Sequence, residues 1–401
     1  MLTADVTKGQ ATKAIHAGSK PGVPQEAVLN PLVLATSFYA AADSGFSANA
    51  LDGPPPFIYT RWNNPTNDLL EKRLAALEGG DAAVVFASGM AATAGLWFSK
   101  LKAGDHLVLS NICYAGVAEL AHDILPGLGI QTTAVDTSDV AAVEAALRPE
   151  TRLVHIETPC NPILRLADIV VIAQLAHSHG VELAVDSTMA TPVATRPIAL
   201  GADYVVHSLT KYACGHGDAL GGAVIGRVDD MAALRKTSLI HFGAAINPFA
   251  AWLILRGLET LPARMAAHQV GAAAVAAFLE GHRSTRRVLW PGLPSHPQHD
   301  LARRQMRNFS GMVSFSADDG PALARRLAER LKVYSYAVSL GKTRSLIYYI
   351  PTEELLGAAF HLTGGAAGAY RDWTGEGTFR LSIGLEDPAD LIADLDQALA
   401  D

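Results

Sequence analysis

The chain has 401 residues, of which 49% are hydrophobic and 18% are charged. This composition is typical of a compact globular protein and excludes fibrous and disordered chains. The length exceeds that of one ordinary hydrophobic core, so we expect one large and one smaller domain. The net charge of −7 is spread along the chain, with no run of lysine or arginine. That distribution disfavours nucleic acid or an anionic membrane as the main partner.

The cysteines and the N-terminus bear on where the protein works. Cys113, Cys160 and Cys214 lie far apart and form no Cys-x-x-Cys pair, so we expect no disulfide framework and no metal centre. Free thiols fit a reducing cytoplasm. The N-terminus carries Asp5 and Lys8 and has no apolar segment, which argues against a signal peptide. No apolar run is long enough to span a membrane, so we expect a cytoplasmic protein.

The first 56 residues show little periodicity and many helix breakers, namely Pro21-Gly22, Pro24 and Pro54-Pro55-Pro56. We expect them to form an extended arm, of the kind that embraces a second subunit. An amphipathic helix is predicted from about residue 66 to 80, where Gly79-Gly80 ends it.

Short apolar runs alternate with helical patterns from residue 82 onwards. Strands are predicted at 82–86, 106–109, 131–135, 153–156, 182–185, 204–206 and 223–225, with helices at 140–147 and 169–179. This alternation predicts an α/β fold with a mostly parallel sheet covered by helices on both faces. We place this large domain at 57–255.

A long helical pattern after Asn247-Pro248-Phe249 leads into a second, smaller part of the chain. Strands are predicted there at 312–315 and 379–383, and helices at 322–331 and 388–400. We therefore place an α+β C-terminal domain at 256–401.

Three consecutive predicted strands are each followed by an ionisable side chain, namely Glu157, Asp186 and Lys211. In a doubly wound sheet, ligands bind at the carboxyl ends of the strands. A lysine that is desolvated there loses its proton more easily and can form an imine. Asp186 could keep the nitrogen of a pyridine ring protonated, or it could cap the next helix. Taken alone, Lys211 could also be a solvated loop residue. Together these groups are what a pyridoxal phosphate enzyme needs.

A phosphate site is predicted between a strand and the helix that follows it. The turn Ser88-Gly89-Met90 would offer backbone N–H groups, although such a turn alone is more often plain packing. Ser208 and Thr210 flank the lysine and could hold an anion beside its amine. The glycine-rich stretch 215–222 is no dinucleotide site, because it does not follow a strand and lacks the spaced acidic residue.

Ordered motifs extend over nearly the whole chain. They are 14–18, 59–66, 87–90, 157–162, 185–188, 208–212, 339–341 and 380–386. In this order they resemble the pyridoxal phosphate enzymes of cysteine and methionine metabolism. That family includes cystathionine γ-synthase, cystathionine lyases, O-acylhomoserine sulfhydrylases and methionine γ-lyase. The resemblance implies fold type I and pyridoxal 5'-phosphate (PLP) as cofactor.

The resemblance also implies roles for individual residues. Lys211 would hold the cofactor and move protons, and Tyr114 would stack on the ring and assist proton transfer. The cofactor-binding residues would be Tyr59, Arg61, Ser88, Gly89, Met90, Tyr114, Glu157, Asn161, Asp186, Thr188, Ser208, Thr210 and Lys211. The substrate-binding residues would be Asn161, Val338, Ser339 and Arg380. Tyr59 and Arg61 would reach the phosphate of a neighbouring subunit, which implies a dimer as the minimal unit and a homotetramer of two dimers.

Departures from the family pattern bear on the reaction. Gly116 stands where methionine γ-lyases carry a cysteine, and we interpret the nearby Cys113 as a packing residue. Val338 stands where members that act on cystathionine commonly have a glutamate. The glycine at position 217 is more typical of the lyases than of the synthases. The stretch 344–352 differs from the family. Its arginine and two tyrosines, expected to be exposed, could shape a different pocket or finish a strand.

We predict γ-elimination on a γ-substituted L-amino acid, as in methionine γ-lyase, giving a 2-oxo acid, ammonia and the released γ-group. The alternative is γ-replacement, as in an O-acetylhomoserine or O-succinylhomoserine sulfhydrylase or cystathionine γ-synthase. A remote alternative is a non-catalytic paralogue that acts as a binding protein. Elimination and replacement share an intermediate, so the motifs do not distinguish the two reactions. They also do not identify the γ-substituent.

Overall fold

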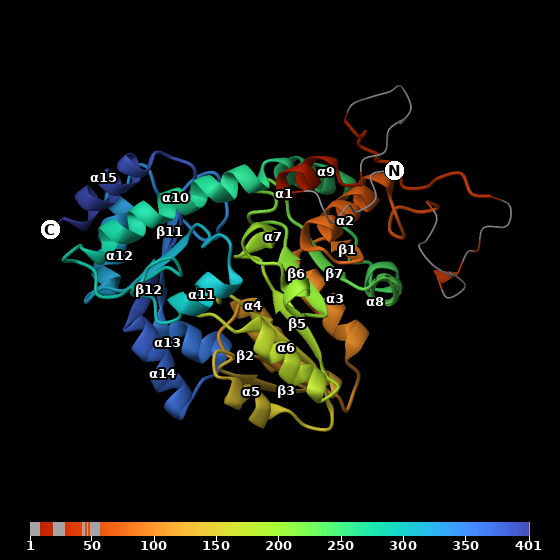
Figure 1. Ribbon diagram of the computed structural model, residues 1–401, viewed down its shortest axis with the longest axis horizontal. Coiled ribbons are helices and arrows are strands. Elements are labelled where there is room, and N and C mark those ends of the chain that lie inside the picture. Colours follow the sequence, from red (N-terminus) through yellow and green to blue (C-terminus); the bar gives the residue numbers. More distant parts are fainter. Residues whose placement is uncertain (1–8, 19–28, 42–44, 46, 49–56, 401) are drawn as a thin grey trace.

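The computed structural model describes residues 9–18, 29–41, 45, 47–48 and 57–400 (Figure 1). Two β-sheets organise this part of the chain. The larger has seven strands in the order β1-β7-β6-β5-β4-β2-β3. Its strands are β1 (Ala82–Phe86), β2 (His106–Ser110), β3 (Gln131–Val135), β4 (Thr151–Glu157), β5 (Glu182–Asp186), β6 (Tyr204–Ser208) and β7 (Gly222–Gly226). All seven lie where the sequence predicts them, to within two residues.

The larger sheet is mostly parallel. β3, β2, β4, β5 and β6 pair in parallel, whereas β7 pairs antiparallel with both β6 and β1. Most residues of its central strands are buried, and all their apolar residues are, as expected for a sheet whose two faces are both covered. This confirms the predicted α/β architecture.

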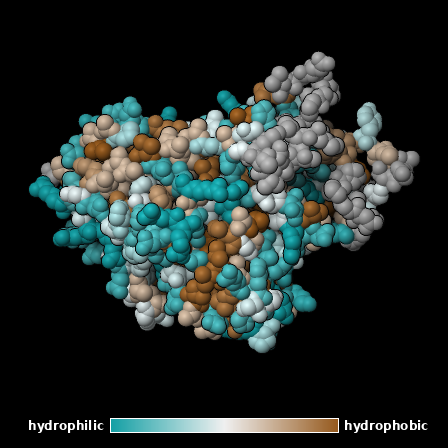
Figure 2. Space-filling view, viewed as in Figure 1, coloured by the Kyte–Doolittle hydropathy of each residue, from teal (hydrophilic) through white to brown (hydrophobic). Residues whose placement is uncertain are grey.

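Helices cover both faces of the larger sheet. α3 (Gly89–Lys100), α4 (Ala115–Glu119) and α8 (Val228–Leu234) share a core with one face. The other face packs against α5 (Val140–Ala146) and α6 (Ile169–Ser178), and against α2 (Pro65–Glu78) and α9 (Pro248–Glu259). Figure 2 shows apolar side chains gathered in a band at the middle of one side of the molecule, where α6 lies. No helix in the described part of the chain is both long enough and apolar enough to cross a bilayer.

Part of the segment expected to be an extended arm is helical, whereas its described residues 29–41 contain no helix, and its contact with a second subunit stays a prediction. Residues Gln10–His16 form helix α1, in which Ala14 is fully buried. The Gln10 side chain donates hydrogen bonds to the carbonyls of Leu77 and Pro192, at 3.0 and 3.1 Å. α1 is therefore anchored on its own chain. The proline-rich breakers predicted to keep the arm extended lie outside the described residues.

The smaller sheet has the order β10-β11-β12-β9-β8. Its strands are β8 (Val288–Leu289), β9 (Met312–Phe315), β10 (Ser335–Tyr336), β11 (Leu346–Pro351) and β12 (Gly377–Ser382). Its helices are α10 (Leu261–Glu280), α11 (His299–Gln305), α12 (Gly320–Arg330) and α15 (Pro388–Leu399). α10 runs from α9 to α15 and so links the two sheets (Figure 1). The domain boundary at residue 256 stays a prediction.

The stretch 344–352 finishes a strand. Tyr349 is buried with its ring 4.8 Å from that of Phe379, and Tyr348 is half-buried with its ring 5.4 Å from that of Tyr336. The expectation that both tyrosines are exposed is therefore wrong. The antiparallel pairing of β11 with β12 draws them into the smaller sheet, and only Arg344 is exposed among the three.

A helical segment between β11 and β12 packs against the helices of the larger sheet. It comprises α13 (Thr352–Leu355), η7 (Leu356–Phe360) and α14 (Gly364–Thr374). Phe360 and Leu356 are buried in one core with Val117 of α4 and with Ala121 of η3 (Leu120–Ile124). This helical segment therefore packs on the helix that directly follows Tyr114.

Gly222 allows close packing between β7 and the turn before α3. A Cβ atom there would overlap the carbonyl of Ser88 and lie 2.9 Å from the Cα of Gly89. Replacing Gly222 by alanine should therefore destabilise the protein by about 1–3 kcal/mol, as overpacking of a core does. Urea unfolding would measure this. Gly368→Ala is the control, because Gly368 has open space around it on α14 and should lose no stability. Equal midpoints for the two variants would contradict this prediction.

Candidate active site

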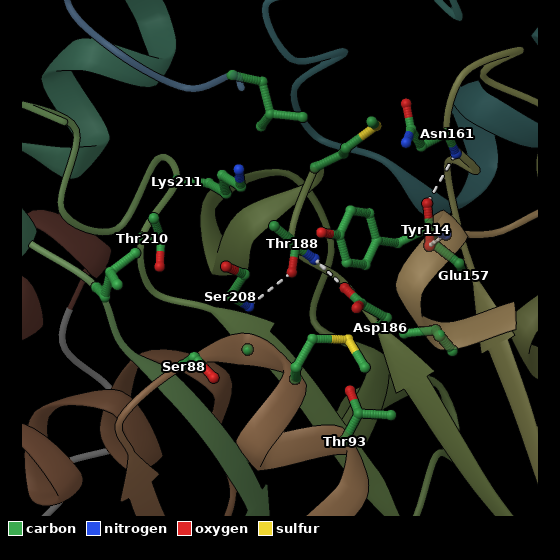
Figure 3. A pocket seen from close by; sticks show the side chains of 16 residues that line it. Ser88, Thr93, Tyr114, Glu157, Asn161, Asp186, Thr188, Ser208, Thr210 and Lys211 are labelled. Carbon is green, nitrogen blue, oxygen red and sulfur yellow. Dashed lines mark hydrogen bonds between the residues drawn. The ribbon is translucent and has the colours of Figure 1, made fainter. Parts of the chain in front are cut away.

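A cavity of about 210 Å³ opens beside the carboxyl ends of β4, β5 and β6 (Figure 3). It is lined by most of the residues that the sequence singles out. These are Ser88, Gly89, Met90, Tyr114, Glu157, Asn161, Asp186, Thr188, Ser208, Thr210 and Lys211. The cavity therefore brings together residues that lie more than 120 positions apart in the chain.

Lys211 lies in the turn that follows β6. Its ammonium group donates a hydrogen bond to the Oγ of Ser339, at 3.1 Å. Burial, and then the positive charges of Arg380 and Lys342, lower the pKa of Lys211 to about 8. A useful fraction of the amine is therefore uncharged near neutral pH, as nucleophilic attack on a carbonyl requires.

This lowered pKa predicts a distinct pH dependence in the apoprotein. The rate at which acetic anhydride modifies Lys211 should rise with pH around a midpoint near 8, because only the uncharged amine reacts. An ordinary lysine has a midpoint of about 10.4. Mass spectrometry of the peptides would follow each lysine separately. A midpoint for Lys211 as high as that of the exposed lysines would contradict the prediction.

Asp186 ends β5 and faces the same cavity. Its Oδ1 accepts a hydrogen bond from the backbone N–H of Thr188, at 2.9 Å. The Thr188 hydroxyl in turn accepts one from the backbone N–H of Ser208, at 2.8 Å (Figure 3). These bonds join the ends of β5 and β6 and fix the carboxylate, which could hold a protonated pyridine nitrogen.

Glu157 positions two other residues of the site. Its carboxylate accepts hydrogen bonds from the backbone N–H of Tyr114, at 2.6 Å, and of Asn161, at 2.7 Å. Burial, and then the negative charge of Asp186, raise the pKa of Glu157, and these two N–H groups and Arg380 oppose that rise. The hydrogen bonds tie the loops after β2 and β4 together.

Arg380, on β12 of the smaller sheet, lies beside the cavity and contacts Asn161, which lines it. It is only 9% exposed, and its guanidinium donates to the Oδ1 of Asn161, at 2.8 Å, and to the carbonyl of Ser339, at 3.1 Å. Ser339 has a φ of +88°, a left-handed conformation that these contacts hold in place. The planar guanidinium suits two-pronged binding of a carboxylate.

The start of α3 forms a cradle that fits a phosphate group. The Ser88 hydroxyl accepts from the backbone N–H of Ala91, at 3.1 Å, and so caps the helix. Gly89 has no side chain, and a Cβ there would lie 2.8 Å from the Cβ of Ser208. Backbone N–H groups at a helix N-terminus bind anions well. Lys211 and Asp186 line the same cavity, so the residues present fit PLP.

Five predicted site residues are not among those that line the cavity, namely Tyr59, Arg61, Val338, Ser339 and Arg380. Ser339 and Arg380 contact Lys211 and Asn161, which do line it. Tyr59 is 43% exposed, and Arg61 lies with its guanidinium 5.4 Å from the Tyr59 ring and donates a hydrogen bond to the carbonyl of Ile240. Val338 is 62% exposed. The contribution of Tyr59 and Arg61 to a neighbouring subunit stays a prediction.

The structure adds lining residues that the motifs did not indicate, namely Thr93, Val117, Met189, Leu220 and Leu340. Two of these residues could have been found from their spacing to predicted site residues. Thr93 lies one helical turn after Met90, and Leu340 directly follows Ser339.

The two departures near Tyr114 have local explanations. A Cβ on Gly116 would lie 3.0 Å from the Tyr114 ring and 3.4 Å from the sulfur of Met90, so a larger residue would displace one of them. Cys113 is buried, and burial raises the pKa of its thiol, which fits a packing residue.

Comparisons with known proteins show to which family the chain belongs. A family model described as "Cys/Met metabolism PLP-dependent enzyme" matches residues 11–400. A canavanine γ-lyase from Pseudomonas canavaninivorans is 41% identical, over 97% of this chain and 96% of the relative. A cystathionine γ-synthase from Mycobacterium tuberculosis is also 41% identical, over 98% and 97%. An L-methionine γ-lyase from Pseudomonas deceptionensis is 38% identical, over 98% and 97%.

A solved structure is similar over nearly the full length. The crystal structure of metB from Corynebacterium glutamicum has a TM-score of 0.89 and 36% identity, and the match covers 98% of each chain. This likeness agrees with fold type I. The chain belongs to the Cys/Met metabolism PLP-dependent enzyme family, and PLP is its cofactor.

Proposed function

We propose that the protein catalyses PLP-dependent γ-elimination. A γ-substituted L-amino acid and water would give a 2-oxo acid, ammonia and the released γ-group. The observation that carries this proposal is a pair of hydrogen bonds at Ser339. Its hydroxyl accepts one from the Lys211 amine, and its backbone carbonyl accepts one from the Arg380 guanidinium. An amino acid whose carboxylate binds Arg380 would present its α-carbon to this amine.

The residues divide the work as follows. PLP supplies the electron sink that makes the α-proton acidic. Arg380 and Asn161 would orient the substrate carboxylate, and Asp186 would hold the ring nitrogen in its protonated form. Lys211 would remove the α-proton and then a β-proton. Tyr114, half-exposed over the cavity, would transfer a proton to the leaving group.

One feature of the chain favours elimination over replacement. Val338 leaves an apolar, exposed side chain where a distal ammonium group would need a carboxylate. Relatives of both kinds are similar to the chain: a canavanine γ-lyase and an L-methionine γ-lyase are 41% and 38% identical, and a cystathionine γ-synthase is 41% identical. γ-Replacement is therefore the second candidate.

The holoenzyme should be incubated with L-methionine, L-canavanine, L-cystathionine and O-acetyl-L-homoserine, each with and without sulfide. We expect 2-oxobutanoate from at least one substrate in the absence of sulfide, with a parallel release of ammonia. Product that forms only when sulfide or another nucleophile is added would contradict elimination and support replacement. Val338→Glu should raise the rate with cystathionine relative to methionine, because the new carboxylate would pair with the distal ammonium group.

A further inference from the structure

Trp97 and His155 form a buried pair on the face of the larger sheet that α3 covers. The indole Nε1–H of Trp97 donates a hydrogen bond to the Nδ1 of His155, at 3.2 Å. The ring centroids are 5.4 Å apart and the planes are nearly perpendicular, at 89°. Trp97 is fully buried and His155 is 2% exposed. Neither residue has a part in the reaction proposed above.

The hydrogen bond fixes the tautomer of the histidine. An indole N–H can only donate, so Nδ1 of His155 is the acceptor and the proton of the neutral ring is on Nε2. Burial lowers the pKa of His155 to about 4, and the negative charge of Asp186 opposes that effect. The ring is therefore uncharged at neutral pH and carries one N–H group, on the side opposite Trp97.

The strand register places this ring beside Asp186. His155 of β4 pairs with Ala184 of β5, and Glu157 pairs with Asp186. Since side chains alternate between the two faces of a sheet, all four lie on the same face. Ala184, the cross-strand partner of His155, is small and carries no polar side-chain group. Asp186 is also the charged residue whose field acts on His155.

We propose that His155 is a positioning residue for Asp186, held by Trp97 in the tautomer whose Nε2–H dipole faces the Asp186 carboxylate. One oxygen of that carboxylate already accepts the N–H of Thr188. No hydrogen bond joins His155 to Asp186 in the described structure, so the dipole acts through space. It favours the charged carboxylate, which a protonated pyridine nitrogen needs as its partner. No proton or bond is transferred.

Matched substitutions of His155 separate this role from simple packing. His155→Met keeps about the same volume but removes the N–H, whereas His155→Gln retains an N–H at a similar reach. Trp97→Phe removes the donor that holds the ring, together with part of the buried indole. Leu153→Met serves as the control. Leu153 lies on the same face of β4 as His155, but two residues farther along the strand from the end where Asp186 lies. Each apoprotein is titrated with PLP, and the visible absorption of the bound cofactor is recorded without substrate.

His155→Met should weaken PLP binding about threefold to tenfold and shift the visible band, as expected for loss of one polar interaction with a charged group. His155→Gln and Leu153→Met should stay within about twofold of the parent, and Trp97→Phe should lie between them. Equal losses in His155→Met and His155→Gln, or no loss in either, would overturn the proposal.

Should the variants fail to fold, nitrogen NMR of His155 in the unaltered protein decides the matter. The proposal requires the Nε2-protonated tautomer at pH values around neutrality, and an Nδ1-protonated ring would overturn it. None of these measurements uses turnover. They therefore remain decisive if the proposed γ-elimination is wrong.

Discussion

Replacing Lys211 by alanine should lower kcat/KM for γ-elimination by about 10²- to 10⁴-fold, the range that a positioned acid–base group contributes. The change removes the amine that is hydrogen-bonded to Ser339 and whose pKa is lowered to about 8. It should also remove the covalent link to PLP, so that cofactor is lost on gel filtration while the parent retains it.

Two controls sharpen this expectation. Lys332→Ala removes an exposed lysine in the loop between α12 and β10 and should leave kcat/KM unchanged. Added methylamine should restore a small part of the activity of Lys211→Ala, because a free amine can enter the space left by the side chain. Activity of Lys211→Ala above about one tenth of the parent would show that another group performs the proton transfers.

The second large effect is expected at Arg380. Arg380→Ala should lower kcat/KM by about 10²- to 10⁴-fold, because two hydrogen bonds to a carboxylate, each worth about 1.5–3 kcal/mol, would be lost. Arg380→Lys should remain at least about tenfold below the parent, since an ammonium group cannot reproduce the planar fork.

The Arg380 variants need a structural check, because the guanidinium also holds Asn161 and Ser339. Asn161→Ala removes one of those bonds and leaves the arginine, so it should cost less than Arg380→Ala. Arg286→Ala, which breaks only a surface pair with Asp318, should match the parent. An Arg380→Ala enzyme with an unchanged KM and kcat would exclude the carboxylate-binding role.

The sequence predicts the larger sheet and most of the cavity well, because both depend on local patterns. A buried parallel strand is a short apolar run, and the polar residues within a few positions after it lie at the carboxyl edge of the sheet. Glu157, Asp186 and Lys211 are found by this rule. The same rule finds Ser88, which follows β1 and caps α3.

What the sequence does not predict depends on contacts between distant segments. β8 and β10 have two residues each, so they are too short to show the alternation of apolar and polar residues that predicts a strand. The burial of Tyr349 follows from its contact with Phe379, thirty positions later, and α1 is anchored by contacts with Leu77 and Pro192. Thr93 and Leu220 line the cavity only because α3 and the loop before β7 fold over it.

The packing of Phe360 and Leu356 against α4 has a consequence for the design of chimaeric enzymes. Exchanging the segment 352–374 for that of a relative would leave the apolar surface of Val117 and Ala121 facing foreign side chains. Because Tyr114 is the residue directly before α4, a poor fit there would disturb the reaction centre as well as the fold. A graft intended to change substrate choice should therefore carry 115–124 together with 352–374.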